Sequence, residues 1–154
     1  MTAQEQDPST TIRATEASLA ATLHLDGEPT PAPTAAPRFA WALLIESPAG
    51  ELAGHAICNY DYSTWRAEGG VFLDDLFVLP QYRRSGYARM LIEALAVEAR
   101  RVGCTKLEWN CYRNNERALR FYEGLGAVRM DNWVVLRVLD DGVGRLAGEA
   151  APGT

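Results

Sequence analysis

A strand, a basic turn and a helix follow one another between residues 71 and 102, and this run constrains the fold more than any other segment. The strand is predicted for Val71–Leu79, because β-prone residues alternate there until Pro80. Alternation places four side chains on one face of this strand: Phe72, Asp74, Leu76 and Val78. The helix is predicted for Tyr87–Val102, where apolar residues recur at helical spacing until Gly103. A strand that leads into an amphipathic helix predicts a sheet packed on helices.

The other elements predict one domain of α/β (α+β) class. Helices are expected at 14–23, with Thr15 as N-cap, and at Glu116–Leu125, ended by Gly126. Strands are expected at Phe39–Glu46, Leu52–Asn59, Lys106–Cys111 and Trp133–Val138, and a loop at Asp61–Gly70. The domain is assigned to residues 39–147. Residues 1–38 form an N-terminal segment with the short helix and a proline-rich linker, and residues 148–154 are expected to form a disordered tail.

Composition excludes several classes of protein. The 154 residues carry a net charge of −5, which disfavours nucleic-acid binding, and no apolar run is long enough for a membrane helix. The start of the chain does not resemble a signal peptide, and the three cysteines have neither zinc-site spacing nor an even number. We therefore expect a cytoplasmic protein without a metal. Residues 76–120 carry +5 and the rest carries −10, a split that either arises by chance or marks two oppositely charged ligands.

The turn between the strand and the helix has the composition of an anion site. Its residues are Val78-Leu-Pro-Gln-Tyr-Arg-Arg-Ser-Gly-Tyr-Ala-Arg89. A glycine turn that opens a helix directs unpaired N–H groups one way, and the helix dipole and the arginines add positive charge. The residue spacing alone supports a phosphate site and an ordinary solvated turn about equally.

Linked motifs around this turn resemble the GNAT family of acetyl-CoA-dependent N-acetyltransferases. The motifs are Arg83-x-x-Gly86-x-Ala88, Asn115 and Phe121-Tyr122-x-x-Leu125-Gly126. Further stretches are similar to the branch that contains diamine (spermidine/spermine) and thialysine acetyltransferases: Tyr62-Ser-Thr-Trp65, Leu73-Asp-Asp-Leu-Phe-Val78, Leu107-Glu-Trp109 and Met130-Asp-Asn-Trp133. The resemblance covers residues 39–147 and implies the GNAT fold, a mixed and mostly antiparallel sheet flanked by helices.

The resemblance also implies how acetyl-CoA, the acyl-donor substrate, is bound. The pyrophosphate is expected at the turn, on Arg83, Arg84, Ser85, Gly86, Tyr87, Ala88 and Arg89. Leu76, Phe77 and Val78 are expected to pair with the pantetheine arm, with the Val78 amide polarising the thioester carbonyl. Asn115 is expected to hold the cofactor near its sulfur.

Three residues are implied in catalysis or in binding of the amine. Tyr122 matches the tyrosine that gives a proton to the departing thiolate, although the residues alone favour a core aromatic. Asp74 and Asp75 match the acidic pair that binds the cationic amine and deprotonates it, although the residues alone also allow a solvated pair near a sheet edge. Asp74, the expected base, stands where the branch usually has glutamate, one methylene longer.

The remaining candidates have weaker support. Trp65 is either a cation–π contact for the amine or a loop anchor. His24 and His55 are isolated in the sequence and are interpreted as structural or surface groups. Cys111 is interpreted as an inert buried thiol, which favours direct transfer over a covalent enzyme.

The combined hypothesis is an N-acetyltransferase that acts on a small cationic amine, such as a polyamine or thialysine. Members of the branch commonly form dimers, so a homodimer is an expectation as well. We expect the fold to be shortened at its N-terminus, without the opening strand and first helix usual in the branch. The alternatives are a catalytically weak acyl-CoA-binding module and an acetyltransferase for proteins or peptides.

Overall fold

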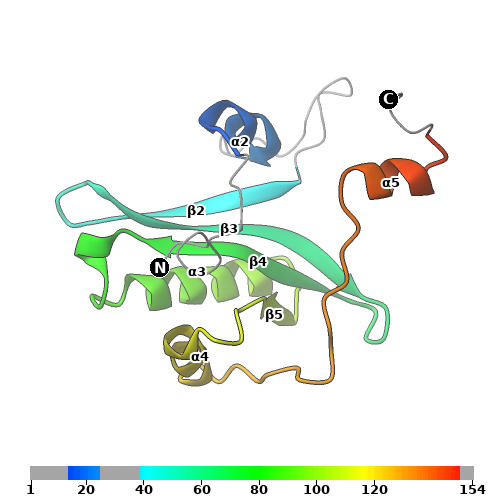
Figure 1. Cartoon of the computed structure of the whole chain (residues 1–154). Coiled ribbons are helices and arrows are strands. Elements are labelled where there is room, and N and C mark those ends of the chain that lie inside the picture. The colour runs from blue at the N-terminus through cyan, green and yellow to red at the C-terminus, as the bar shows by residue number, and fades with distance from the viewer. Residues whose placement is uncertain (1–13, 25–38, 150–154) are drawn as a thin grey trace. The chain divides into compact units, whose positions relative to one another are not determined.

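A mixed sheet of five strands forms the centre of the first part of the chain (Figure 1). The computed structural model describes residues 14–24 and 39–149. The chain divides into two compact units, residues 1–115 and 116–154, which are described separately. The strands of the first unit, in sheet order, are β1 (Leu23–His24), β2 (Ala40–Glu46), β3 (Leu52–Ser63), β4 (Glu68–Val78) and β5 (Lys106–Trp109). Strands β2, β3 and β4 are antiparallel, whereas β1–β2 and β4–β5 are parallel pairs. The predicted mixed, mostly antiparallel sheet is confirmed.

The first helix and the first hairpin form as predicted. Helix α2 (Glu16–Thr22) is capped by Thr15, whose Oγ1 accepts a hydrogen bond from the Ser18 amide at 3.1 Å. Between β2 and β3, Ser47 Oγ accepts hydrogen bonds from the amides of Ala49 and Glu51. The predicted linker at 27–38 lies outside the described residues, as do 150–154 of the predicted tail.

The second hairpin is longer than predicted, and the loop expected at Asp61–Gly70 is wrong. Strand β3 continues to Ser63 and β4 begins at Glu68, so only residues 64–67 form the turn. Gly70 lies within β4. Because it has no side chain, it leaves room for the ion pair between Lys106 and Asp61, which is 2.6 Å long. A Cβ at Gly70 would lie 2.6 Å from the Lys106 side chain. The glycine pair therefore makes room within a strand and does not mark a loop.

A β-bulge interrupts β4 at Asp74. Ile57 pairs with Asp75 and Cys58 pairs with Leu73, so Asp74 is an extra residue without a partner on β3. The bulge reverses the alternation, and Phe72 therefore lies on the face opposite to Leu76 and Val78, contrary to the prediction. Pairing between β4 and β5 ends at Leu73 and Trp109. Strand β5 accordingly stops two residues before the predicted Cys111.

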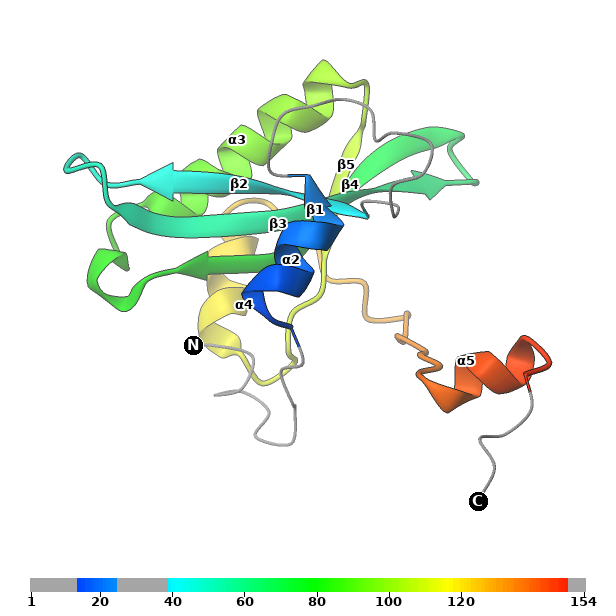
Figure 2. The same cartoon turned by 90° about the horizontal axis from the view of Figure 1, so that it is seen from above.

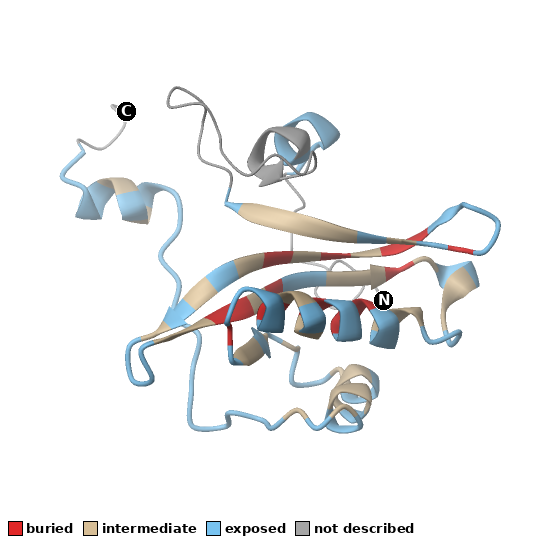
Figure 3. Ribbon diagram, turned by 180° about the vertical axis from the view of Figure 1, so that it is seen from behind, coloured by how far each residue is buried: buried red, intermediate tan, exposed pale blue. Residues whose placement is uncertain are grey.

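Helix α3 (Tyr87–Arg101) covers one face of the sheet, as Figures 2 and 3 show. Its buried residues are Leu91, Ile92, Leu95 and Ala99, and they follow the predicted apolar stripe. They share the core with the buried sheet residues Ala53, Ala56, Cys58, Val71 and Leu73. Because Leu76 and Val78 pair with Ala56 and Gly54, they lie on this covered face. The opposite face carries the side chains of residues such as His55 and Phe77.

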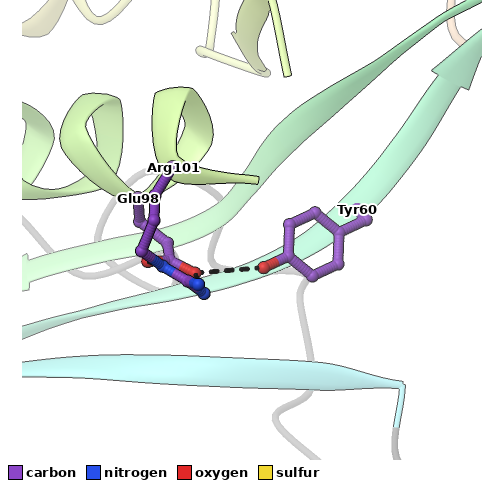
Figure 4. A network of polar contacts seen from close by, with 3 residues as sticks. All are labelled: Tyr60, Glu98 and Arg101. Atoms are coloured by element: carbon purple, nitrogen blue, oxygen red, sulfur yellow. Dashed lines mark hydrogen bonds and ion pairs between the residues drawn. The ribbon is translucent and has the colours of Figure 1, made fainter. Parts of the chain in front are cut away.

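A polar network ties the last turn of α3 to β3 (Figure 4). Glu98 accepts hydrogen bonds from Arg101 Nε and Nη2 at 2.7 and 2.6 Å, and the Tyr60 hydroxyl donates to Glu98 Oε1 at 3.3 Å. The two bonds from Arg101 lower the pKa of Glu98, while burial and the Glu98 charge raise the pKa of Tyr60. The folded protein therefore retains the protonated phenol.

Alkaline pH is expected to remove the stabilisation that Tyr60 provides. Because its pKa is raised on folding, the contribution is complete below the ordinary tyrosine value and is lost as the pH rises through the raised value. Tyr60→Phe should cost up to about 1 kcal/mol of unfolding free energy at pH 7 and less at about pH 11. Urea unfolding at both pH values measures the difference. Tyr62→Phe, at an exposed position on the same strand, is the control. If the cost of Tyr62→Phe in unfolding free energy also fell between the two pH values, the prediction would be contradicted.

The described residues of the second unit form two short helices. Helix α4 (Glu116–Glu123) is followed by Gly126 at φ 89°, where the amides of Gly126 and Ala127 bond to the carbonyls of Glu123 and Tyr122. This is the glycine helix end that the sequence predicts, although α4 stops two residues before Leu125. Helix α5 (Asp141–Leu146) was not predicted, since two glycines lower its helix propensity.

The strand predicted at Trp133–Val138 is wrong. Within the described residues this segment has no strand pairing, and Trp133, Val134, Val135 and Leu136 are 63–88% exposed. A strand requires main-chain hydrogen bonds to a neighbour, and an apolar run alone does not provide them.

Candidate active site

The bulge at Asp74 leaves one edge of β4 open. Beyond Leu73, β4 continues to pair with β3 but no longer with β5. Among the described residues, the main chain of residues 75–78 therefore has a sheet partner on one side only. We call this stretch the open edge. An unpaired strand edge offers amide and carbonyl groups to an extended ligand.

Two amides are directed at the open edge. The amide of Leu79 donates to the carbonyl of Ala53, and Val78 pairs with Gly54. In an antiparallel ladder this makes Gly54–Val78 a pair without mutual hydrogen bonds, so the main-chain groups of Val78 point away from β3. Leu76 lies two residues earlier and has the same orientation, whereas the main chain of Phe77 bonds to β3. Leu76 and Val78 thus offer amides at this edge, whereas the Phe77 side chain lies on the sheet face with His55.

Arg83 connects the open edge to the turn before α3. Its Nε donates to the Val78 carbonyl at 2.9 Å, and its guanidinium lies 5.6 Å from the centre of the Phe77 ring. The turn is also held to the β2–β3 hairpin by a hydrogen bond from the Tyr82 hydroxyl to Glu51. These contacts position the turn relative to the strand that precedes it.

The turn itself opens the N-terminus of α3. Gly86 adopts φ 86° as the N-cap, and no side chain caps the helix there. The first N–H groups of α3 therefore have no intrahelical acceptor. They can donate to a ligand at the N-terminus, where the helix dipole is positive. A Cβ at Gly86 would meet nothing within 4 Å, so glycine is required for its φ. Arg84, Ser85 and Arg89 are exposed around this end. The residues present fit a pyrophosphate.

Arg84 stands in a conformation that favours glycine, with φ 67°. We expect Arg84→Gly to be more stable than Arg84→Ala by about 1 kcal/mol, because alanine keeps the left-handed strain and glycine does not. The two variants lose the same guanidinium, so the comparison isolates the backbone. Urea denaturation of both variants measures the difference. An alanine variant as stable as the glycine variant would show that the turn relaxes without cost.

The acidic pair separates into two environments. Asp74 is the exposed bulge residue. Burial, and to a smaller extent the charge of Asp74, raises the pKa of the Cys58 thiol to about 12. Asp75 lies on the other side of the sheet, where its Oδ2 is 2.8 Å from Nε2 of His55 on β3. His55 was interpreted as an isolated structural or surface group, and this contact was missed. Only the register of β3 against β4 after the bulge could have revealed it.

The other predicted residues are more scattered. Trp65 is 88% exposed in the β3–β4 turn, which lies about 20 Å along β4 from Asp74 at the rise of a strand. The first unit therefore does not bring Trp65 to the acidic pair. Asn115 lies in the loop before α4, and its main-chain N–H donates a hydrogen bond to the Tyr112 carbonyl at 2.9 Å. Tyr122 is half-buried on α4, in the second unit, with its ring 5.3 Å from that of Phe121.

The described residues contain neither a cluster of metal-ligand side chains nor a membrane-spanning helix. In the part of the chain that the structure describes, no three His, Cys, Asp or Glu side chains gather as metal ligands. Over the same residues, no helix has the length and hydropathy needed to cross a membrane.

Comparison with known proteins gives a consistent family. Residues 11–127 match the model of the acetyltransferase (GNAT) family. The chain is 33% identical over 102 residues to the thialysine N-epsilon-acetyltransferase of Caenorhabditis elegans, which covers 64% of this chain and 63% of that protein. It is 31% identical over 90 residues to the L-ornithine N5-acetyltransferase NATA1 of Arabidopsis thaliana, covering 58% of this chain and 40% of that protein. The matched segments thus span about 40–63% of these curated relatives.

A solved structure supports the same fold. An integron cassette protein from V. cholerae superposes with a TM-score of 0.65 at 24% identity, covering 71% of this chain and 67% of that chain. At this identity the likeness concerns the fold alone.

Proposed function

Because the chain belongs to the GNAT acetyltransferase family, we propose that it transfers the acetyl group of acetyl-CoA directly to a primary amine of a small cationic molecule. The observation that carries this proposal is the open edge of β4 joined, through Arg83, to the uncapped N-terminus of α3. A strand edge suits an extended pantetheine arm, and a helix N-terminus with arginines suits a pyrophosphate. The strand edge and the helix N-terminus adjoin each other, just as the pantetheine arm adjoins the pyrophosphate in acetyl-CoA.

Acetyl-CoA supplies an activated acyl group, and the chain's own residues bind and orient it. The amide of Leu76 pairs with the pantetheine arm, and the amide of Val78 donates to the thioester carbonyl oxygen, where negative charge develops. The N–H groups at the start of α3 bind the pyrophosphate, together with the side chains around that turn: Arg83, Arg84, Ser85, Tyr87 and Arg89. Asn115 holds the cofactor near its sulfur. Tyr122 gives its hydroxyl proton to the departing sulfur.

Direct transfer is supported by the state of the thiols. Burial and the Asp74 charge raise the pKa of Cys58 to about 12, and burial raises the pKa of Cys111. Because the thiolate is the reactive form, both cysteines are poor nucleophiles at neutral pH. A covalent acetyl-cysteine route is therefore disfavoured for these two thiols.

A cationic acceptor is supported by charge and by the relatives. Asp74 and Asp75 carry negative charge beside the open edge, where an ammonium group would be attracted. The relatives' names specify an amine nitrogen of thialysine or of L-ornithine. We assign Asp74 and Asp75 to binding of the amine. Trp65 remains a candidate contact for the far end of a long substrate.

An acceptor panel tests the function. The protein is incubated with acetyl-CoA and, in turn, ornithine, lysine, thialysine, spermidine and a lysine-containing peptide, with CoA release and product mass as readouts. We expect acetylation of at least one small amine at a rate well above that of the peptide. Acetyl-CoA binding by calorimetry without turnover on any amine would instead indicate an acyl-CoA-binding module. Turnover on the peptide alone would indicate a protein acetyltransferase.

A further inference from the structure

The contact between His55 and Asp75 is not explained by the roles assigned so far. On the basis of the proposed acetyl transfer, we propose that His55, held by Asp75, accepts the proton that the acceptor ammonium must lose before it can attack. The two side chains meet at 2.8 Å across β3 and β4, with His55 29% and Asp75 55% exposed. The pair is therefore partly screened from solvent but open to a ligand.

His55 lies beside the residues that offer amides to the acyl group. It pairs directly with Phe77, and their rings are 5.8 Å apart. Phe77 stands between Leu76 and Val78, whose amides point at the open edge. Within the first unit, α3 covers the face of the sheet that carries Leu76 and Val78 side chains. An amine can approach the open edge from the other face, where His55 and Asp75 lie.

The geometry assigns a tautomer to the imidazole. The carboxylate oxygen of Asp75 is an acceptor, so Nε2 of His55 donates the hydrogen bond, and in the neutral imidazole Nδ1 carries the lone pair. Asp75 contacts the ring from β4, and Leu44, the register partner of His55 on β2, is apolar. The guanidinium of Arg83 lies 5.6 Å from the centre of the neighbouring Phe77 ring and adds positive charge there. Asp75 orients the imidazole, and His55 keeps its second nitrogen for the substrate.

The carboxylates are less suited to accept this proton. A free carboxylate is a much weaker base than an imidazole, whose basicity lies near neutral pH. Asp75 already accepts a hydrogen bond from His55 through Oδ2. Asp74 is the bulge residue, and its side chain is one methylene shorter than the glutamate usual in the branch. These two residues retain the task of attracting the cation.

The proposed step balances. One proton passes from the ammonium nitrogen to Nδ1 of His55, and the bonding pair stays on the nitrogen. The nitrogen forms a bond to the acyl carbon, and the carbon–sulfur bond breaks with its electron pair on sulfur. Sulfur receives a proton from Tyr122, the nitrogen loses its excess proton to solvent, and solvent reprotonates Tyr122. His55 returns its proton to solvent, so one proton is released overall.

Kinetics of matched variants test the role of His55. With the best amine of the panel, His55→Gln is expected to lower kcat/KM about 100-fold at pH 7.5 and leave acetyl-CoA affinity unchanged. The deficit should shrink towards about pH 9.5, because the amine then loses its proton without help. Leu44→Gln, beside His55 on β2, is the control and should remain within twofold of the unaltered protein. His55→Gln with kcat/KM within threefold and an unchanged pH profile would overturn the proposal.

Asp75 is distinguished by which kinetic parameter changes. Asp75→Asn is expected to lower kcat about 10- to 100-fold, because the imidazole loses its orientation, and to raise the KM of the amine as well, because a charge that attracts the cation is lost. A rise in KM alone would show that Asp75 only binds the amine, and would overturn its positioning role.

A nitrogen-15 NMR spectrum of the histidines gives a readout that does not depend on turnover. The expected result is that the neutral form of His55 carries its proton at Nε2, with the tautomer changed in Asp75→Asn. Protonation at Nδ1 in the unaltered protein would overturn the proposal. Failure of the acetyltransferase function itself is distinct, because the unaltered protein would then release no CoA with any amine.

Discussion

Replacement of Tyr122 by phenylalanine is expected to lower kcat about 100- to 1,000-fold. A phenol is almost fully protonated at neutral pH and can give its proton to the departing sulfur, whereas phenylalanine keeps the ring and loses the donor. The free energy of unfolding should change little, because the substitution conserves the volume of a half-buried side chain. Stopped-flow or steady-state measurement of CoA release with a saturating amine gives kcat.

The neighbouring Phe121 provides a matched control. Its ring lies 5.3 Å from that of Tyr122, so Phe121→Leu disturbs the same part of α4 without touching a hydroxyl. We expect Phe121→Leu to reduce stability and to leave kcat within a few-fold of the unaltered protein. If Tyr122→Phe retained kcat within threefold, Tyr122 would be a core aromatic, as its helix pattern alone suggests.

The strand, the basic turn and α3 could be predicted because their information is local. Strand β4 ends at Val78, two residues before Pro80, and Gly103, at φ 82°, follows the end of α3. The helix predicted for Tyr87–Val102 is observed at Tyr87–Arg101. The same local composition predicted the turn but left a phosphate site and an ordinary solvated turn about equally supported, and the structure adds that Gly86 opens the helix without a side-chain cap.

The open edge could not be predicted, because a bulge is a property of two strands. The alternation around Asp74 is regular in the sequence and predicted one continuous face. Only the pairing of Cys58 with Leu73, and of Ile57 with Asp75, reveals the extra residue. That single residue reverses the face of Phe72 relative to Leu76, ends the pairing with β5, and leaves the edge where the acyl group is proposed to bind.

Contacts between distant residues were missed for a related reason. His55 and Asp75 are 20 positions apart and meet only through the register of the β3–β4 hairpin. Conversely, the apolar residues of Trp133–Val138 predicted a strand, but the pattern does not supply a pairing partner. Patterns of single segments predict elements well, whereas contacts depend on register.

Val78→Pro is expected to lower kcat about 100- to 1,000-fold with the fold retained. The Val78 amide points away from β3, so a proline there removes no hydrogen bond of the β3–β4 ladder. It does remove the N–H that is proposed to polarise the thioester carbonyl, and loss of one such donor costs this much in comparable sites. Circular dichroism and urea unfolding check the fold, and CoA release with a saturating amine gives kcat.

Two substitutions make this test specific for the amide. Like Val78→Pro, Val78→Ala loses packing of the side chain. It keeps the main-chain N–H, however, and should therefore retain kcat within a few-fold. Phe77→Pro should unfold the sheet, because the Phe77 main chain bonds to β3 and its N–H cannot be lost without breaking the ladder. If Val78→Pro and Val78→Ala lost activity equally, the side chain would be responsible and the amide would have no role in transfer. A folded Val78→Pro variant that is inactive, beside an active Val78→Ala, would trace the rate to one main-chain N–H that the bulge at Asp74 leaves exposed.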